Sequence, residues 1–135
     1  MPSNINDFDK DLRVFATVKV PDDHSNMVKK VAMQALSGVV NKTPVDTGRA
    51  RSNWMTAVNA VPSETIELSA NLSRQQAAAE SLNRGVAVIG EAKPFSSISI
   101  ANNLPYIGVL EYGGSNQAPD GMVRVTLAEI EAAFK

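Results

Sequence analysis

Hydrophobic positions recur at helical spacing over His24–Lys42, the most regular stretch of the chain. Steps of three and four residues relate the members of one wide apolar stripe: Met27, Val28, Val31, Ala32, Ala35, Leu36 and Val39. A stripe with this period predicts an amphipathic helix with one buried face. Pro44 follows soon after, and because the residue before a proline avoids helical backbone angles, we expect the helix to end at Lys42 or Thr43.

The preceding segment, residues 1–23, is less regular. Apolar residues follow helical steps at Ile5, Phe8, Leu12 and Phe15. Residues 14–20 also alternate, so the second half of this segment would suit a strand as well. We favour a helix that is interrupted at Pro21, since proline disrupts a helix interior. We expect one domain over 1–135, in which residues 24–135 form the core and 1–23 form a candidate arm.

Alternation of apolar and polar residues predicts short strands in the middle of the chain. Ser52–Val61 alternates, and Thr65–Ser69 would return beside it after a turn at residues 62–64. Phe95–Ala101 is a third predicted strand. Tyr106–Tyr112 is the fourth, because it follows a proline and stops at two glycines that permit a sharp change of direction.

Two further stretches predict helices. Ser73–Asn83 is rich in helix-forming residues, with Ser73 as the N-cap and Gly85 placed to end the helix. Met122–Phe134 has one apolar edge at helical spacing. The order of elements predicts an α+β fold: a small twisted antiparallel sheet backed by helices, with a long helix in the N-terminal half and a C-terminal helix.

Composition narrows the classes of function. The 135 residues suit a single domain, and the net charge of −1 gives no general attraction for nucleic acid or for an anionic membrane. No apolar run reaches the roughly 20 residues that span a bilayer, so we expect no membrane partner. The chain has no cysteine, which excludes disulfides and thiolate chemistry.

The sequence offers few groups for catalysis. His24 is the single histidine, so the usual zinc ligand sets cannot form, and there is no G-x-S-x-G turn and no glycine-rich phosphate loop. Asp46, Glu111 and Asp120 could meet in space, although acids on loops more often form turns. A buried Glu111 would need a cationic partner such as Arg49 or Arg51; alternatively it faces water. We expect no catalytic residue, metal or cofactor.

Two polar stretches, taken together, resemble one known family. Thr43–Arg51 follows the long helix and is Thr-Pro-Val-Asp-Thr-Gly-Arg-Ala-Arg, and Tyr106–Arg124 contains Leu-Glu-Tyr-Gly, Gln-Ala-Pro and Gly-Met-Val-Arg. In this order and spacing they are similar to the small tail-completion and head–tail joining proteins of long-tailed bacteriophages. The resemblance covers most of residues 27–134, but residues 63–104 are generic and the N-terminal segment departs from it.

The resemblance implies a structural virion protein rather than an enzyme. Such proteins assemble in the host cytoplasm into rings, usually hexamers, at the head-proximal end of the tail. There they contact the tail tube or tape-measure protein and the head connector, and the DNA that passes through the lumen is a further candidate contact. The resemblance leaves open the layer: tail terminator, tail completion or a connector-side component of the head. A small phage hydrolase and a monomeric adaptor are alternatives from other classes.

A ring requires one face of a subunit to meet a different face of the next. We therefore predict that the loop at residues 45–51 of one subunit meets the loop at residues 113–121 of its neighbour. Arg49 or Arg51 would pair with Glu111 or Asp120 and so set the register. The candidate interface residues are Asp46, Arg49, Arg51, Glu111, Gln117, Asp120 and Arg124. The alternative is that the first loop serves as a tight helix-to-strand turn.

Overall fold

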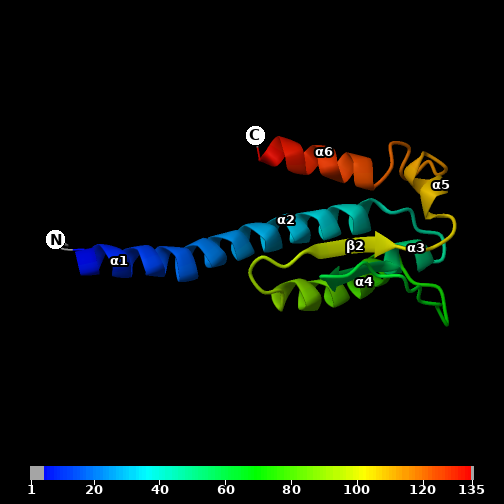
Figure 1. Ribbon diagram of the computed structural model, residues 1–135. Coiled ribbons are helices and arrows are strands. Elements are labelled where there is room, and N and C mark those ends of the chain that lie inside the picture. The colour runs from blue at the N-terminus through cyan, green and yellow to red at the C-terminus, as the bar shows by residue number, and fades with distance from the viewer. Residues whose placement is uncertain (1–4, 135) are drawn as a thin grey trace.

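A computed structural model describes residues 5–134. Its longest feature is one unbroken helix that consists of α1 (Ile5–Val14), the π-helical turn η1 (Phe15–Lys19) and α2 (Val20–Lys42). The first half of this helix projects well away from the other elements (Figure 1). Residues 1–4 of the predicted arm, and residue 135, lie outside the described part of the chain.

Pro21 does not interrupt the helix, contrary to our prediction. It lies in the first turn of α2, where the η1 turn has already changed the hydrogen-bond pattern: the Val20 N–H bonds the carbonyl of Phe15, five residues back. A π-turn accommodates an extra residue within a helix, and a proline near such a change has no regular bond to break. The arm therefore continues directly into the helix that carries the core.

Two antiparallel strands form the sheet. β1 (Trp54–Val58) pairs with β2 (Ile98–Asn102), and the register places Trp54 opposite Asn102 and Val58 opposite Ile98. This confirms the α+β class and both of these strand predictions. The other two predicted strands are wrong, since residues 5–134 contain no further strand.

The first of these, Thr65–Ser69, lies beside the body as irregular chain. The side chain of Asn53 binds it as a strand would: Nδ2 donates to the Ile66 carbonyl over 2.9 Å, and Oδ1 accepts from the Ile66 N–H over 2.6 Å. The second, Tyr106–Tyr112, forms the short helix α5 (Ile107–Glu111). It ends before Gly113, whose φ of 88° favours glycine.

The helix predicted over Ser73–Asn83 is longer in the structure. α4 (Arg74–Gly90) begins with the predicted N-cap, because Ser73 and Gln76 form a reciprocal capping box. The prediction that Gly85 ends it is wrong. Gly85 lies inside α4 against Leu36 and Thr56, where an added Cβ would overlap the Leu36 side chain. The glycine therefore allows α4 to approach α2 closely.

The core lies around the second half of α2. On one side of this helix are α4, the sheet and the short helix α3 (Arg49–Ser52), and on the other is α6 (Val123–Ala133), the predicted C-terminal helix (Figure 1). Close packing of α6 depends on Gly38, because an added Cβ would overlap Thr126. The largest fully buried apolar side chains come from α2, α4 and the N-cap of α6: Leu36, Val40, Ile89 and Met122.

Candidate functional site

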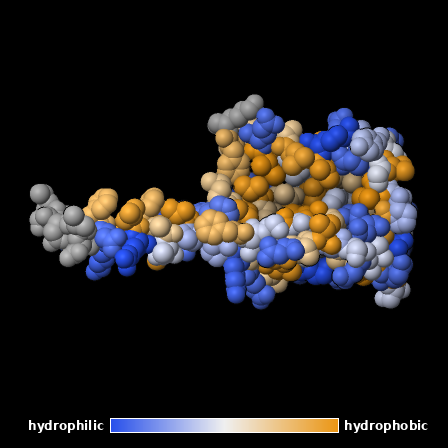
Figure 2. Space-filling view, in the orientation of Figure 1, coloured by the Kyte–Doolittle hydropathy of each residue, from blue (hydrophilic) through white to orange (hydrophobic). Residues whose placement is uncertain are grey.

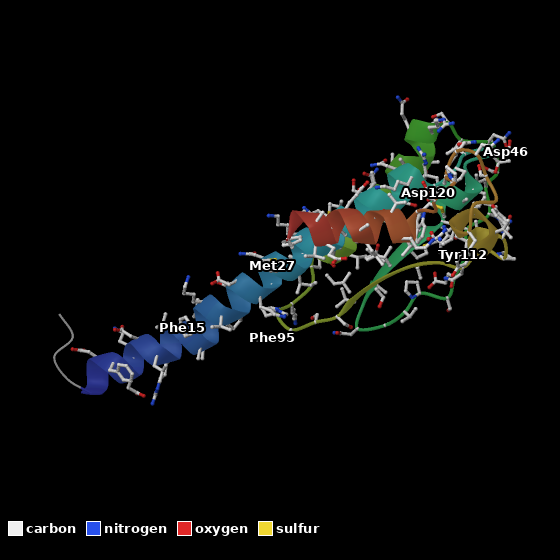
Figure 3. All side chains as sticks on the ribbon, turned by 90° about the horizontal axis from the view of Figure 1, so that it is seen from above. Phe15, Met27, Asp46, Phe95, Tyr112 and Asp120 are labelled. Atoms are coloured by element: carbon white, nitrogen blue, oxygen red, sulfur yellow. The ribbon has the colours of Figure 1, made fainter. Side chains whose placement is uncertain are left out.

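The two stretches that carry the family resemblance lie together at the end of the molecule away from the arm. We call this region, residues 43–51 and 106–124, the two-loop end. Asp46, Tyr112 and Asp120 are near one another in Figure 3, whereas Phe15 is at the opposite extremity. Two stretches more than fifty positions apart therefore form one surface.

Gln117 joins the two loops. Its side-chain Oε1 accepts from the Val45 N–H over 2.9 Å, and its Nε2 donates to the Val45 carbonyl over 3.1 Å. The amide group thus binds the backbone of Val45 on both sides, much as a neighbouring strand would. The two loops therefore meet within one chain, whereas the meeting that we predicted, between the loops of two subunits, stays a prediction.

Arg51 is buried, with 8% of its surface exposed. Its Nε and Nη2 donate to the Thr43 carbonyl over 3.0 and 2.8 Å, and Nη2 also donates to the Asn41 carbonyl over 3.0 Å. These carbonyls belong to the end of α2, where no helical donor remains for them. The guanidinium therefore completes the helix and places a positive charge at its negative end.

The charge of Arg51 has no carboxylate partner among the ion pairs of residues 5–134. Burial and, to a smaller extent, the nearby charge of Arg74 lower the pKa of Arg51 from its usual value. The guanidinium is held by backbone carbonyls, including that of Arg74 at 3.4 Å. Arg51 is therefore part of the fold and not a free contact for a neighbour.

A chain of buried polar groups continues from this point. Thr43 Oγ1 donates to the Val39 carbonyl over 2.6 Å and accepts from Trp54 Nε1 over 2.7 Å. Ser81 Oγ donates to the Arg51 carbonyl over 2.7 Å and accepts from the Trp54 N–H over 3.2 Å. The network connects α2, α3, β1 and α4 directly beneath the two loops, and so fixes the position of the first loop.

Glu111 fixes the second loop. Its Oε1 accepts from the N–H groups of Met122 and Val123, each over 2.8 Å, and its Oε2 accepts from the Arg124 N–H over 3.1 Å. The carboxylate thus satisfies the free N–H groups at the start of α6 and lies at the positive end of that helix. Burial alone would raise the pKa of Glu111, but these hydrogen bonds hold it below its ordinary value.

The Gly-Met-Val-Arg signature is explained by this cap. Gly121 has a φ of 90°, and an added Cβ would overlap Glu111. Met122 is fully buried in the core. Arg124 Nε donates to Glu111 Oε2 over 3.1 Å, and its guanidinium lies 4.9 Å from the centre of the Tyr112 ring. Each residue of the signature therefore has a structural role where α5, the loop and α6 meet.

The ion pair predicted across subunits was Arg49 or Arg51 with Glu111 or Asp120, and three of these four side chains have partners within their own chain. Arg51 binds backbone carbonyls. Arg49 pairs with Glu67 and Arg124 pairs with Glu111. The side chains of Asp46 and Asp120 remain at the exposed surface of the two loops. Of the seven candidate interface residues, Arg51, Glu111 and Gln117 thus position the loops, and the aspartates are best placed for contact with another molecule.

The sequence analysis identified neither Asn53 and Ser81 beneath the loops nor the buried role of Thr43. Thr43, Asn53 and Ser81 are buried polar side chains with complete sets of partners. In the sequence, Asn53 and Ser81 are only polar residues within a predicted strand and a predicted helix. Their residue type alone does not show whether they are buried or exposed.

Two small hollows flank the loops: one of about 330 Å³ beside Asp46 and Tyr106, and one of about 200 Å³ beside Arg74 and Asp120.

The arrangement contains little that would support catalysis. Within residues 5–134, no three His, Cys, Asp or Glu side chains gather as metal ligands. His24 lies against the ring of Phe95, with 4.8 Å between ring centres, far from the two-loop end. The pKa of Glu111 is lowered, whereas a glycosidase general acid requires a raised one. The described helices include none with the length and apolar content needed to cross a bilayer.

Comparison with known proteins found no family model, no curated protein and no solved structure that matches this chain. The site is therefore interpreted from its own contacts.

Replacing Glu111 by Gln should lower the free energy of unfolding at pH 7 by about 1–3 kcal/mol, since three N–H groups lose a charged acceptor. The folded-state pKa of Glu111 is lowered, so the carboxylate stabilises the fold above its unfolded pKa of about 4.3. That contribution is lost as pH falls through the folded-state pKa. Urea denaturation at pH 7 and near pH 3 should show the difference from wild type narrowing in acid.

The matched control is Glu64→Gln, at an exposed position outside the network, which should change stability by less than about 0.5 kcal/mol at either pH. A Glu111→Gln protein as stable as this control at pH 7 would contradict the capping role.

Replacing Arg51 by Ala should lower the free energy of unfolding by about 2–4 kcal/mol, because buried carbonyls at the end of α2 lose their donors. Arg74→Ala is the control: it removes a like charge near Arg51 from an exposed position and should leave stability within about 0.5 kcal/mol of wild type. Thermal and urea denaturation measure the stability of both variants. Equal stability of the two variants would show that Arg51 is dispensable to the fold.

Proposed function

We propose that this chain is a structural protein of the head-proximal end of a phage tail, a ring-forming tail-completion, terminator or neck component that joins tail to head. The observation that carries the proposal is the construction of the two-loop end. Both signatures of the resemblance contribute to it, and their distinctive residues hold two loops in one fixed surface. A surface built in this way suits recognition of another protein.

The rigidity of the loops supports a binding role. Gln117 binds the first loop, Glu111 binds the start of α6, and Arg51 lies beneath both at the end of α2. Pre-organised loops lose less conformational freedom on binding than mobile ones. Asp46 and Asp120, which are exposed on this rigid base, are proposed to contact the tail tube, the tape-measure protein or the head connector.

The position of the surface also suits an assembly of stacked layers. The two-loop end and the projecting helix lie at opposite extremities of the molecule (Figure 3). A subunit of this shape can contact one neighbour through the helix and another protein through the loops. The same arrangement is compatible with a connector-side position at the head, which we retain as the second candidate because it uses the same two ends.

Purified protein should bind the open ends of assembled tail tubes, and negative-stain electron microscopy should show one additional ring-shaped layer there. Asp46→Lys with Asp120→Lys should weaken this binding by about tenfold or more, because two exposed charges at the contact are reversed. The control is Glu80→Lys with Glu91→Lys, which reverses two exposed charges on α4 and at its C-terminal end, outside the two loops. It should bind as wild type does.

Wild-type protein that ignores tube ends but binds purified head connectors would move the assignment to the head side. Protein that binds neither would contradict the proposed function.

A further inference from the structure

The first half of the long helix carries an apolar stripe that its own chain does not cover. Every side chain from Asp7 to Val20 is exposed. Phe8, Leu12 and Phe15, at helical steps of four and three, are 66%, 52% and 51% exposed. Two exposed phenylalanines on one face leave a large apolar surface in water, since burial of one aromatic side chain removes about 150–250 Å² of surface from contact with water. The stripe therefore indicates a contact surface.

The helix joins the body at His24, which lies against Phe95. The arm before it, residues 5–23, contains five aspartates and three basic side chains. Asp9 pairs with Arg13 over 3.0 Å, and Lys19 pairs with Asp23 over 3.4 Å. Helices that bind anionic membranes or nucleic acid carry an excess of positive charge, so the acidic balance of the arm favours a protein partner.

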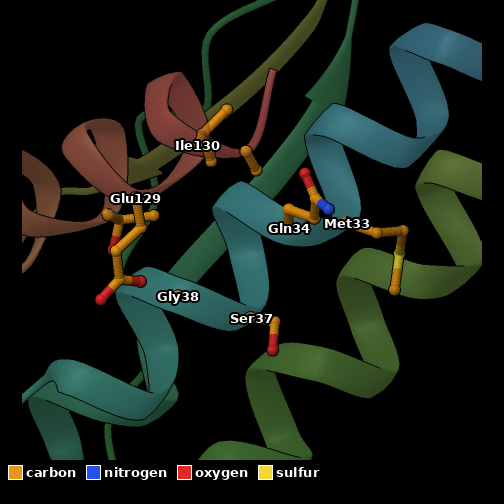
Figure 4. A pocket seen from close by; sticks show the side chains of 8 residues that line it. Met33, Gln34, Ser37, Gly38, Glu129 and Ile130 are labelled. Carbon is orange, nitrogen blue, oxygen red and sulfur yellow. The ribbon is translucent and has the colours of Figure 1, made fainter. Parts of the chain in front are cut away.

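The same molecule contains an apolar groove between α2 and α6. Its volume is about 510 Å³, and Met33, Gly38, Ile130 and Ala133 are among the residues that line it. Figure 4 shows side chains of both helices around this space. The rim is held by the Lys42–Glu129 ion pair at 2.8 Å. The groove is thus a preformed hollow with polar edges.

The dimensions of the stripe and the groove agree. Phe8 and Phe15 are seven positions apart along the helix, and Thr126 and Ala133, which line the groove along α6, are also seven apart. At 1.5 Å per residue each is about 10 Å long. Figure 2 shows hydrophobic surface along one side of the arm and in the hollow below α6, on the same side of the molecule. A second copy can therefore place its stripe on this groove.

The arm cannot occupy the groove of its own chain. Leu12 and Gln34 lie on one continuous helix, about 33 Å apart along its axis at 1.5 Å per residue. A straight helix cannot return upon itself without breaking, so the occupant must come from another molecule. The chain itself supplies the matching ridge, because its arm has the right length and presents large apolar side chains.

We propose that the arm of one copy packs its Phe8–Leu12–Phe15 stripe into the α2–α6 groove of a neighbouring copy. This rests on the proposed function, because a ridge on one subunit and a groove on the next form the head-to-tail contact from which rings are built. The proposal identifies the partner surface of the arm and assigns subunit contacts to this side of the molecule. The two-loop end then remains available for other proteins.

Disulfide cross-linking tests the contact directly, since the chain has no native cysteine. Leu12→Cys protein mixed with Gln34→Cys protein should give disulfide-linked pairs in which mass spectrometry finds the arm peptide joined to the groove peptide. A link within one chain is excluded, because a disulfide requires Cα atoms roughly 4.4–6.8 Å apart. Asp11→Cys, one position along the arm, should not link to Gln34→Cys and is the matched control.

A second variant measures the strength of the contact. Leu12→Lys should weaken self-association by about tenfold or more in analytical ultracentrifugation. Its melting temperature as a monomer should equal that of wild type, because the side chain is exposed in its own subunit. Links between two Leu12→Cys arms alone, links equal in yield to the control, or wild-type association unaffected by Leu12→Lys would overturn the proposal.

The ring is tested separately by a chain that carries both cysteines. Head-to-tail contacts should give a covalent ladder that extends beyond dimers, whereas a reciprocal pair stops at dimers. A ladder that stops at dimers would support the arm–groove contact and contradict the ring of the proposed function. Binding to tube ends without any arm–groove link would support the proposed function and overturn this contact.

Discussion

The carbonyl of Thr43, buried where α2 ends, is the point on which the rest of the structure depends. Arg51 binds it with two donors, and the hydroxyl of the same threonine accepts from Trp54. A helix end buried without donors would be costly, so this contact allows α2 to stop inside the protein. It also aligns α3, β1 and α4 against the last turns of α2, and thereby positions the loop that precedes Arg51.

Two of the wrong secondary-structure predictions have identifiable physical causes. Tyr106–Tyr112 is a short apolar run, and periodicity cannot distinguish a buried strand from one turn of helix at that length. Its helical form follows from Glu111, whose carboxylate must reach the start of α6. Long amphipathic stretches do not have this ambiguity, which is why α2 and α6 were predicted correctly. The prediction that Pro21 interrupts the helix was wrong because the hydrophobic pattern does not reveal the π-turn that accommodates it.

The candidate site was only partly predictable for a related reason. The two stretches could be identified from their residues, and their proximity follows from the Gln117–Val45 contact. Whether a charged residue faces a neighbour or its own backbone depends on burial, which a single sequence does not give. Arg51 and Glu111 both bind backbone groups of their own chain, so two residues that we predicted at an interface instead hold the loops in place.

These contacts divide the molecule into a body with a rigid two-loop end and an arm with an uncovered apolar stripe. We propose that the chain functions as an assembly of identical copies. Native mass spectrometry of the purified wild-type chain, over a range of concentrations, tests it most directly. We expect increasing concentration to lead to one closed oligomer, with no larger species beyond it. A chain that remains monomeric at hundreds of micromolar, or that grows without a limiting size, would contradict it.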